Sequence, residues 1–271
     1  MSKPSVLLLG SSDVGAGVDC ESVANQLASV ARVEHVADVA AAGTYLKGTS
    51  PDVELIVLCE SRRGQYSSAA VDELRRLAPL ARFWRVLGSW HEGEPRSGRP
   101  PAGCISSYWH QWPARAAREL AAEAGEGNAT WTLPVTATAD ERGLAEADLP
   151  IERHAGTIVV CANRFESAAA LADACRLGGY DTRAIREGDE FHADRIVAMV
   201  WDANPECVTD VTRIAALRQS VGGAPLVAVV GFPRAVDVRS AQQAGVAAVV
   251  SKPYSVRDLL WHVERAVNAQ P

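Results

Sequence analysis

Lys252 is the residue of this sequence whose setting points most directly to chemistry. It follows an apolar run and precedes Pro253 and Tyr254, and Ser255 then suits the N-cap of a helix predicted over residues 256–267. A strand that ends in lysine places an ammonium group at its carboxyl end, where open α/β sheets gather their ligands. Because Pro253 restricts the turn that follows, we expect Lys252 to present a cation at that edge.

Asp202 supplies a carboxylate at the end of another apolar run, residues 195–201. The segment around Lys252, Pro253 and Tyr254 resembles the end of the receiver domain of bacterial two-component response regulators. In that family the lysine before the proline contacts a phosphorylated aspartate. The resemblance therefore implies that Asp202 is a candidate phosphoacceptor and Lys252 the lysine that contacts its phosphoryl group.

The last predicted helix has one apolar stripe, made by Leu259, Leu260, Val263 and Val267, and the charged side chains Arg257, Asp258, Glu264 and Arg265 outside it. The resemblance implies that this helix helps to form a partner-binding face, which in the receiver family often mediates self-association. We therefore expect Arg257 and Arg265 to belong to a protein-contact surface, with a homodimer among the candidate assemblies.

The second half of the chain departs from a working receiver at several positions. A receiver needs two acidic residues after its first strand to hold Mg²⁺, a hard cation that takes oxygen ligands, but residues 161–163 read Cys-Ala-Asn. The family's spacing to the following proline places Trp201, not Asp202, at the acceptor position. The switch position is Gly231, which has no hydroxyl. We expect weak Mg²⁺ binding and a vestigial phosphorylation site.

The first half departs further from the pattern. Its first predicted strand is followed by a single carboxylate, Asp13, and its third ends at Cys59 and Glu60, either of which stands where the acceptor would be. Ser89 could stand at the switch position. No Lys-Pro pair follows the fifth predicted strand. The resemblance in this half is one of strand order alone, so we interpret both halves as degenerate receiver-like domains.

An aromatic cluster of the first half allows two interpretations. Its members crowd the fourth and fifth predicted strands, with His91 and His110 among them: Phe83, Trp84, Trp90, Tyr108, Trp109 and Trp112. One interpretation is a local hydrophobic core. The other is a recognition surface for a peptide or a partner domain, since tryptophan combines a large apolar area with one donor. In that case Trp90, Trp109, His110 and Trp112 are candidate surface residues.

The remaining motifs support no further site. The six cysteines form no CxxC pair and the six histidines show no ligand spacing to one another, so neither a disulfide framework nor a metal site is predicted. The glycines at positions 10, 15 and 17 match neither the dinucleotide fingerprint nor a phosphate-binding loop. We therefore expect no cofactor.

The pattern of apolar runs predicts two α/β domains in tandem, each a flavodoxin-like, five-stranded parallel sheet with helices on both faces. We expect domains over residues 1–122 and 155–271, joined by an acidic linker over residues 123–154. Strands are predicted at 5–9, 33–36, 55–58, 83–87 and 103–107, then at 157–160, 180–185, 195–201, 225–230 and 247–250. Helices are predicted at 21–31, 67–78, 114–122, 166–177, 208–219, 234–244 and 256–267.

Length and charge bound the function. A chain of 271 residues with 48% hydrophobic residues can build two cores. A net charge of −6 disfavours nucleic acid and anionic lipid as partners, and no apolar run is long enough to span a membrane. We expect a cytoplasmic bacterial signalling protein, a tandem pseudo-receiver with no output domain and no enzymatic activity. It would act through contacts with a histidine kinase or another signalling protein. The alternative is a small-molecule or nucleotide-binding enzyme on the same type of sheet.

Overall fold

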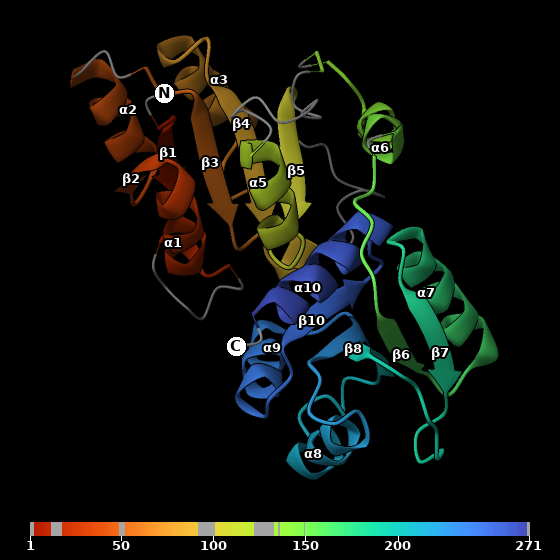
Figure 1. Ribbon diagram of the computed structural model, residues 1–271. Helices are drawn as coiled ribbons and strands as arrows, with labels where there is room; N and C mark the ends of the chain where they lie inside the picture. The colour runs from red at the N-terminus through yellow and green to blue at the C-terminus, as the bar shows by residue number, and fades with distance from the viewer. Residues whose placement is uncertain are drawn as a thin grey trace. The chain divides into compact units, whose positions relative to one another are not determined.

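The computed structural model describes residues 3–11, 18–48, 52–91, 101–121, 133–134, 136–148 and 150–269. The chain divides into two compact units, Met1–Leu149 and Pro150–Pro271 (Figure 1). Each unit has its own sheet and its own buried apolar clusters, as expected when a chain of this length splits into two domains.

A five-stranded parallel sheet forms the centre of the first unit, with the strand order β2-β1-β3-β4-β5. Its strands are β1 (Ser5–Leu9), β2 (Arg32–Val36), β3 (Leu55–Glu60), β4 (Arg82–Leu87) and β5 (Cys104–Tyr108). Its helices are α1 (Cys20–Val30), α2 (Val39–Gly48), α3 (Ser68–Leu77), the short 3₁₀ turn η2 (Ser89–His91), α5 (Trp112–Ala121) and α6 (Ala139–Asp148).

The second unit repeats this plan, with the strand order β10-β9-β8-β6-β7. Its strands are β6 (Thr157–Cys161), β7 (Asp181–Ile185), β8 (Ile196–Ala203), β9 (Leu226–Gly231) and β10 (Ala248–Lys252). Its helices are α7 (Phe165–Leu177), α8 (Val211–Ser220), α9 (Ala235–Gln243) and α10 (Val256–Asn268).

The two sheets have the same topology. In each, counting strands along the unit, the spatial order is second, first, third, fourth, fifth, and neighbouring strands pair in parallel. This is the flavodoxin-like order of doubly wound α/β sheets, in which ligands gather at the carboxyl ends of the strands. The predicted fold class is confirmed.

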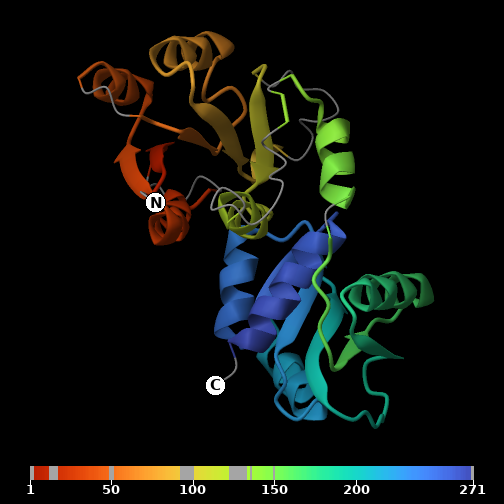
Figure 2. The same ribbon diagram turned by 45° about the horizontal axis from the view of Figure 1, so that its top comes forward.

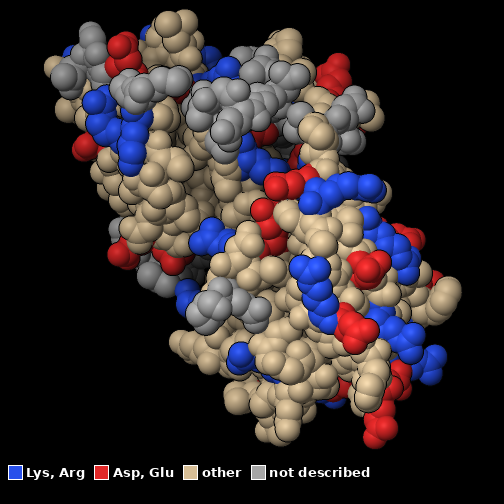
Figure 3. Space-filling model, in the orientation of Figure 1, with Lys and Arg blue, Asp and Glu red and all other residues tan. Residues whose placement is uncertain are grey.

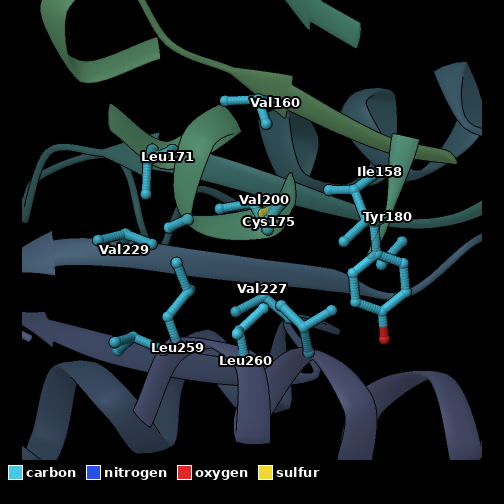
Figure 4. Packing of buried hydrophobic residues seen from close by; sticks show 14 of the residues in the cluster. Ile158, Val160, Leu171, Cys175, Tyr180, Val200, Val227, Val229, Leu259 and Leu260 are labelled. Atoms are coloured by element: carbon cyan, nitrogen blue, oxygen red, sulfur yellow. The ribbon is translucent and has the colours of Figure 1, made fainter. Parts of the chain in front are cut away.

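The buried strands pack on both faces, which explains their continuous apolar sequences. In the second unit, Ile158 and Val160 pack with α7 and α10, as Figure 4 shows, while Val159 points to the opposite face beside α8. The first unit divides in the same way, between a cluster under α1 and α5 and a cluster under α2 and α3. Figure 2 shows these helices around each sheet.

The structure differs from the sequence-based prediction in two helices of the first unit. Helix α2 was not predicted, although Asp38 accepts a hydrogen bond from the Ala41 amide at 2.8 Å in its first turn. Helix α6 lies inside the predicted linker, and an Arg118–Glu146 ion pair of 2.7 Å ties it to α5. The division between the units therefore falls at Leu149 and Pro150, close to the end of the predicted linker.

Candidate functional site

An ion pair joins Asp202 and Lys252 at the carboxyl edge of the second sheet. The Lys252 ammonium donates a hydrogen bond to Oδ1 of Asp202. The Asp202 side chain is 13% exposed and that of Lys252 is 38% exposed, so the pair lies at the surface of the edge and not in the core. The structure brings together the two residues that the sequence singled out as acceptor and phosphate-contacting lysine.

The neighbouring strand makes this contact possible. Strand β9 lies between β8 and β10 and ends at Gly231, which stands in register with Lys252. A Cβ added to Gly231 would meet no atom within 4 Å, so the space above β9 is open to the lysine side chain. Gly231 also leaves the predicted switch position without a hydroxyl, as the sequence indicated.

The turn after β10 leads directly into the last helix. The Lys252–Pro253 peptide bond is cis, and Ser255 caps α10 by accepting a hydrogen bond from the Asp258 amide at 3.1 Å. Tyr254 is half-buried against the cluster under α7 and α10. Burial is the main cause that raises the pKa of its hydroxyl, and nearby Cys175 and Asp202 contribute. The Ser255 cap and the packing of Tyr254 therefore anchor the turn that follows Lys252.

Trp201 does not share the exposed edge with Asp202. Its indole is buried in the cluster on the opposite face of the sheet, which includes Val159 and Met199. Successive side chains of a strand point to opposite faces, so burial of Trp201 directs the Asp202 carboxylate elsewhere. The family's spacing would select Trp201, but in this fold only Asp202 faces the lysine.

Acidic side chains that sequence reasoning missed also reach this edge. Burial raises the pKa of the Cys161 thiol to about 12, with contributions from Glu187, Asp189 and Asp202. Glu187 follows β7 and is neutralised by Arg213 through an ion pair of 2.6 Å. No group of three metal-ligating side chains converges here in the part of the chain that the structure describes. The residues present therefore do not fit the acidic Mg²⁺ site of a working receiver.

Two exposed aromatic rings lie at the same edge and were also missed. Phe165 begins α7, directly after β6, and Phe232 follows β9; both are largely exposed. Phe232 has a φ of 46°, a left-handed conformation that a bulky residue rarely adopts. The edge that carries the ion pair therefore also carries two large apolar side chains that are open to solvent.

The equivalent edge of the first unit is closed by a buried ion pair. Glu60, the last residue of β3, accepts two hydrogen bonds from Arg85 on β4, at 2.6 and 2.9 Å, and His91 Nε2 lies 3.5 Å away. All three side chains are buried. Burial alone would raise the pKa of Glu60, but the hydrogen bonds from Arg85, together with the nearby His91, outweigh it and hold the pKa below its ordinary value.

Cys59, the residue before Glu60, is equally enclosed. Cys59 is buried next to Cys20, and a hydrogen bond with Cys20 together with burial raises the pKa of Cys59 well above its ordinary value. Asp13 lies outside the described residues. All six cysteines are free thiols. Neither Cys59 nor Glu60 is placed to accept a group from solvent.

The aromatic cluster of the first unit combines both interpretations. Trp112 is 1% exposed and packs edge-on against Trp84, with ring centroids 4.9 Å apart, so its assignment to a partner surface is wrong. Trp90 is 76% exposed. Trp109 and His110 are half-buried, and Trp109 donates a hydrogen bond to Ser89 Oγ at 3.2 Å. Trp84 and Trp112 are core residues, whereas Trp90 offers an indole to solvent.

Helix α10 has the predicted buried stripe, but its outer face differs from the prediction. Asp258 is buried, and Arg257 is half-buried with a hydrogen bond to the Pro150 carbonyl at 3.0 Å. Asp258 is therefore not an outer charge, and Arg257 is held by the Pro150 carbonyl. Arg265 is exposed and lies over the Trp261 ring, 5.3 Å from its centroid. Arg265 therefore remains the candidate contact residue on this helix.

Surface charge is mixed in sign. On the face seen in Figure 3, acidic and basic side chains are interspersed, and the whole chain has a net charge of −6. No described helix combines the length and the apolar character needed to cross a membrane.

Among the comparisons with known proteins, only the one with solved structures found similar chains. No family model matches the sequence, and no curated protein matches it. A response regulator from Burkholderia pseudomallei, with a phosphorylated aspartic acid, is 17% identical over 42% of this chain and 69% of its own, with a TM-score of 0.34. A CheY-like response regulator from Mesorhizobium loti is 18% identical over 42% of this chain and 99% of its own, with a TM-score of 0.34.

A third similar structure spans both units. The C-terminus of RcsC from E. coli, which contains a linker region and a phosphoreceiver domain, is 16% identical over 99% of this chain and 95% of its own, with a TM-score of 0.32. The assignment of the fold rests on the strand order of the two sheets, which is independent of these similarities.

Proposed function

We propose that this protein is a tandem pseudo-receiver of a bacterial signalling pathway, which acts through protein contacts and has no enzymatic activity. The Asp202–Lys252 ion pair carries this proposal. It sets an acidic side chain against a lysine at the carboxyl edge of a flavodoxin-like sheet, the arrangement that the receiver resemblance implies for an acceptor and its lysine.

The same edge lacks the parts that would make phosphorylation productive. Cys161, Ala162 and Asn163 supply no carboxylate for Mg²⁺, and Glu187 is already paired with Arg213. A phosphoryl group on Asp202 would be held by Lys252, without a metal ion to neutralise its remaining charge. Gly231 offers no hydroxyl that could close on the phosphate. We therefore propose that Asp202 is vestigial as an acceptor.

Protein contacts would instead use the exposed apolar groups. Phe165 and Phe232 stand at the edge that carries the ion pair, and Arg265 lies on the outer face of α10. Aromatic side chains and arginine are the residues that most often dominate binding energy at protein interfaces. A histidine kinase, another signalling protein or a second copy of this chain would suit such a surface.

Treatment with phosphoryl donors tests the proposal. The purified protein is incubated with acetyl phosphate, or with beryllofluoride, in the presence of Mg²⁺, and is compared with Asp202→Asn by intact mass, thermal melting and sedimentation. We expect no added mass and unchanged melting and assembly in either protein.

An added phosphoryl mass in the wild type that Asp202→Asn lacks would overturn the vestigial assignment, and so would a raised melting temperature confined to the wild type. Either result would indicate an ordinary phosphorelay role. Asp181→Asn, which removes an exposed carboxylate at the opposite end of the sheet, is the matched control for loss of one negative charge.

A further inference from the structure

A second cluster of ionisable side chains lies in the second unit, at the amino edge of its sheet. Glu152 and His154 precede β6, and Glu264 lies on the third turn of α10. One ligand atom from each of the three lies within 4.8 Å of the others, and His154 Nε2 is 3.9 Å from Glu264 Oε2. The segment before β6 and the last helix therefore meet through an imidazole and two carboxylates.

This cluster is separate from the Asp202–Lys252 pair. His154 lies before the first residue of β6, whereas Lys252 is the last residue of β10, and parallel strands keep these ends at opposite edges. Helix α10 begins next to Lys252 and runs back across the sheet, which brings Glu264 to the amino edge.

The imidazole of His154 is held in place by its surroundings. Its backbone amide donates to the Gly178 carbonyl at 2.8 Å, and its ring stacks on Tyr180, with centroids 5.4 Å apart. Gly179 has a φ of 83°, and a Cβ there would lie 2.8 Å from the His154 carbonyl oxygen. Only glycine allows this close approach, so the backbone of His154 is fixed before any ligand binds.

The two carboxylates converge on the same place. One carboxylate oxygen of Glu152, one of Glu264 and a ring nitrogen of His154 all lie within 4.8 Å of one another. Glu264 is half-buried next to the buried Val263, while Glu152 is exposed and free to turn. Two like charges next to an imidazole repel each other, and a bound cation would relieve that repulsion.

We propose that Glu152, His154 and Glu264 bind a divalent transition-metal ion, with Zn²⁺ as the best fit. Zinc takes imidazole nitrogen at about 2.0–2.1 Å and carboxylate oxygen at about 2.0–2.2 Å. Rotation of the two glutamate side chains would bring the ligand atoms to that spacing. An imidazole in the set favours zinc over magnesium or calcium. Three protein ligands leave a coordination position for water.

The bound ion would link the segment before β6 to helix α10. Sequence spacing could not indicate the site, because Glu264 lies far along the chain from His154 and on a different element. This site does not depend on the proposed signalling function, since it uses neither Asp202 nor Lys252.

Calorimetric titration of the full-length protein with Zn²⁺ tests the proposal, together with the visible absorption of bound Co²⁺ and the melting temperature. We expect one saturable site, a raised melting temperature, and an affinity lowered by roughly tenfold or more in His154→Gln and in Glu264→Gln. Glu264→Gln keeps the size of the side chain and removes its negative charge. It therefore tests the ligand set even where His154→Gln disturbs the stacking on Tyr180.

His192→Gln and Glu166→Gln are the matched controls, because both residues are exposed in the same unit and lie outside the cluster. Both should bind Zn²⁺ as the wild type does. Protein whose thiols are blocked with N-ethylmaleimide should also keep the site. The proposal fails if the wild type shows no saturable binding at sub-millimolar Zn²⁺, if Glu264→Gln binds as tightly as the wild type, or if blocking the thiols removes the binding.

Discussion

The carboxyl edges of the two sheets each carry an ion pair, which is buried in the first unit and partly exposed in the second. In each unit a carboxylate lies at or next to the end of the central strand, Glu60 on β3 and Asp202 on β8. A cation reaches it from the adjacent strand β4 in the first unit, and from β10, one strand further away, in the second. In the first unit both partners are buried and the arginine binds through two hydrogen bonds. In the second unit the lysine is partly exposed and reaches over Gly231.

Burial decides what each pair can do. A buried pair cannot lose one partner without leaving an uncompensated charge in the core. The pair of Glu60 and Arg85 therefore has a structural role. A surface pair contributes little to stability and can exchange its partner for another charged group. The carboxyl end of the central strand therefore holds a buried, structural pair in one unit and a partly exposed pair in the other.

The largest expected effect follows from breaking the buried pair. Arg85→Met leaves the Glu60 carboxylate buried without its two hydrogen bonds, and should lower the free energy of unfolding of the first unit by about 3–5 kcal/mol. Chemical denaturation followed by circular dichroism measures the change. Asp72→Asn, which removes the exposed carboxylate of the pair with Arg75, should change the free energy by less than about 1 kcal/mol. Equal effects of the two variants would contradict the contrast between buried and exposed pairs.

The aromatic residues beside the first edge provide a second large effect. Trp112→Ala removes a buried indole that packs on Trp84 and should cost about 3–5 kcal/mol of unfolding free energy. Trp90→Ala removes an exposed indole and should stay within about 0.5 kcal/mol of the wild type. The denaturant midpoints, compared at constant slope, measure both changes. If Trp112→Ala does not lower the free energy of unfolding, Trp112 is again a candidate for the partner surface.

We expect acid to lower the stability of the first unit through protonation of Glu60. Its pKa is below the ordinary value in the folded state, so its contribution to stability is present above the ordinary glutamate pKa of about 4.3 and is lost as the pH falls through the folded-state pKa. We expect the unfolding free energy of the wild type to fall in that acid window. Glu60→Gln should lack this part of the slope. Parallel slopes for both proteins would show that another group controls the acid response.

The smallest expected effect belongs to the exposed pair. Lys252→Met should change the unfolding free energy of the second unit by about 0–1 kcal/mol, because the ammonium group is partly solvated in the pair. Thermal and chemical unfolding measure the change. A loss near that of Arg85→Met would make Lys252 a structural residue and would remove the contrast between the two edges.

Most of the fold could be predicted because the buried strands are continuous apolar runs that end at polar or glycine residues. Two helices escaped prediction for local reasons. In α2, a run of alanines with Gly43 inside it hides the helical period. In α6 the composition is acidic, but Thr138 and Glu141 form a capping box, with the Thr138 amide donating to Glu141 Oε2 at 2.7 Å. That signature can be read from the sequence.

The sequence predicted those site residues that the end of a single strand can indicate. Lys252 stands out by its context, and the structure pairs it with Asp202. The sequence could not show that Trp112 faces inward, because spacing within a cluster of aromatic residues does not say which side is buried. Glu187 and Phe232 were missed since each lies in a loop whose nearness to Asp202 follows from sheet topology, not from local pattern.

The edge-on packing of Trp84 and Trp112 gives the first unit an optical signature. Two indoles at a centroid distance of 4.9 Å and an interplanar angle of 70° couple their electronic transitions, and the sign and strength of the resulting near-ultraviolet circular dichroism depend on that fixed angle. The signal should vanish when the packing loosens. The loss of order in the first unit can therefore be followed with no added dye.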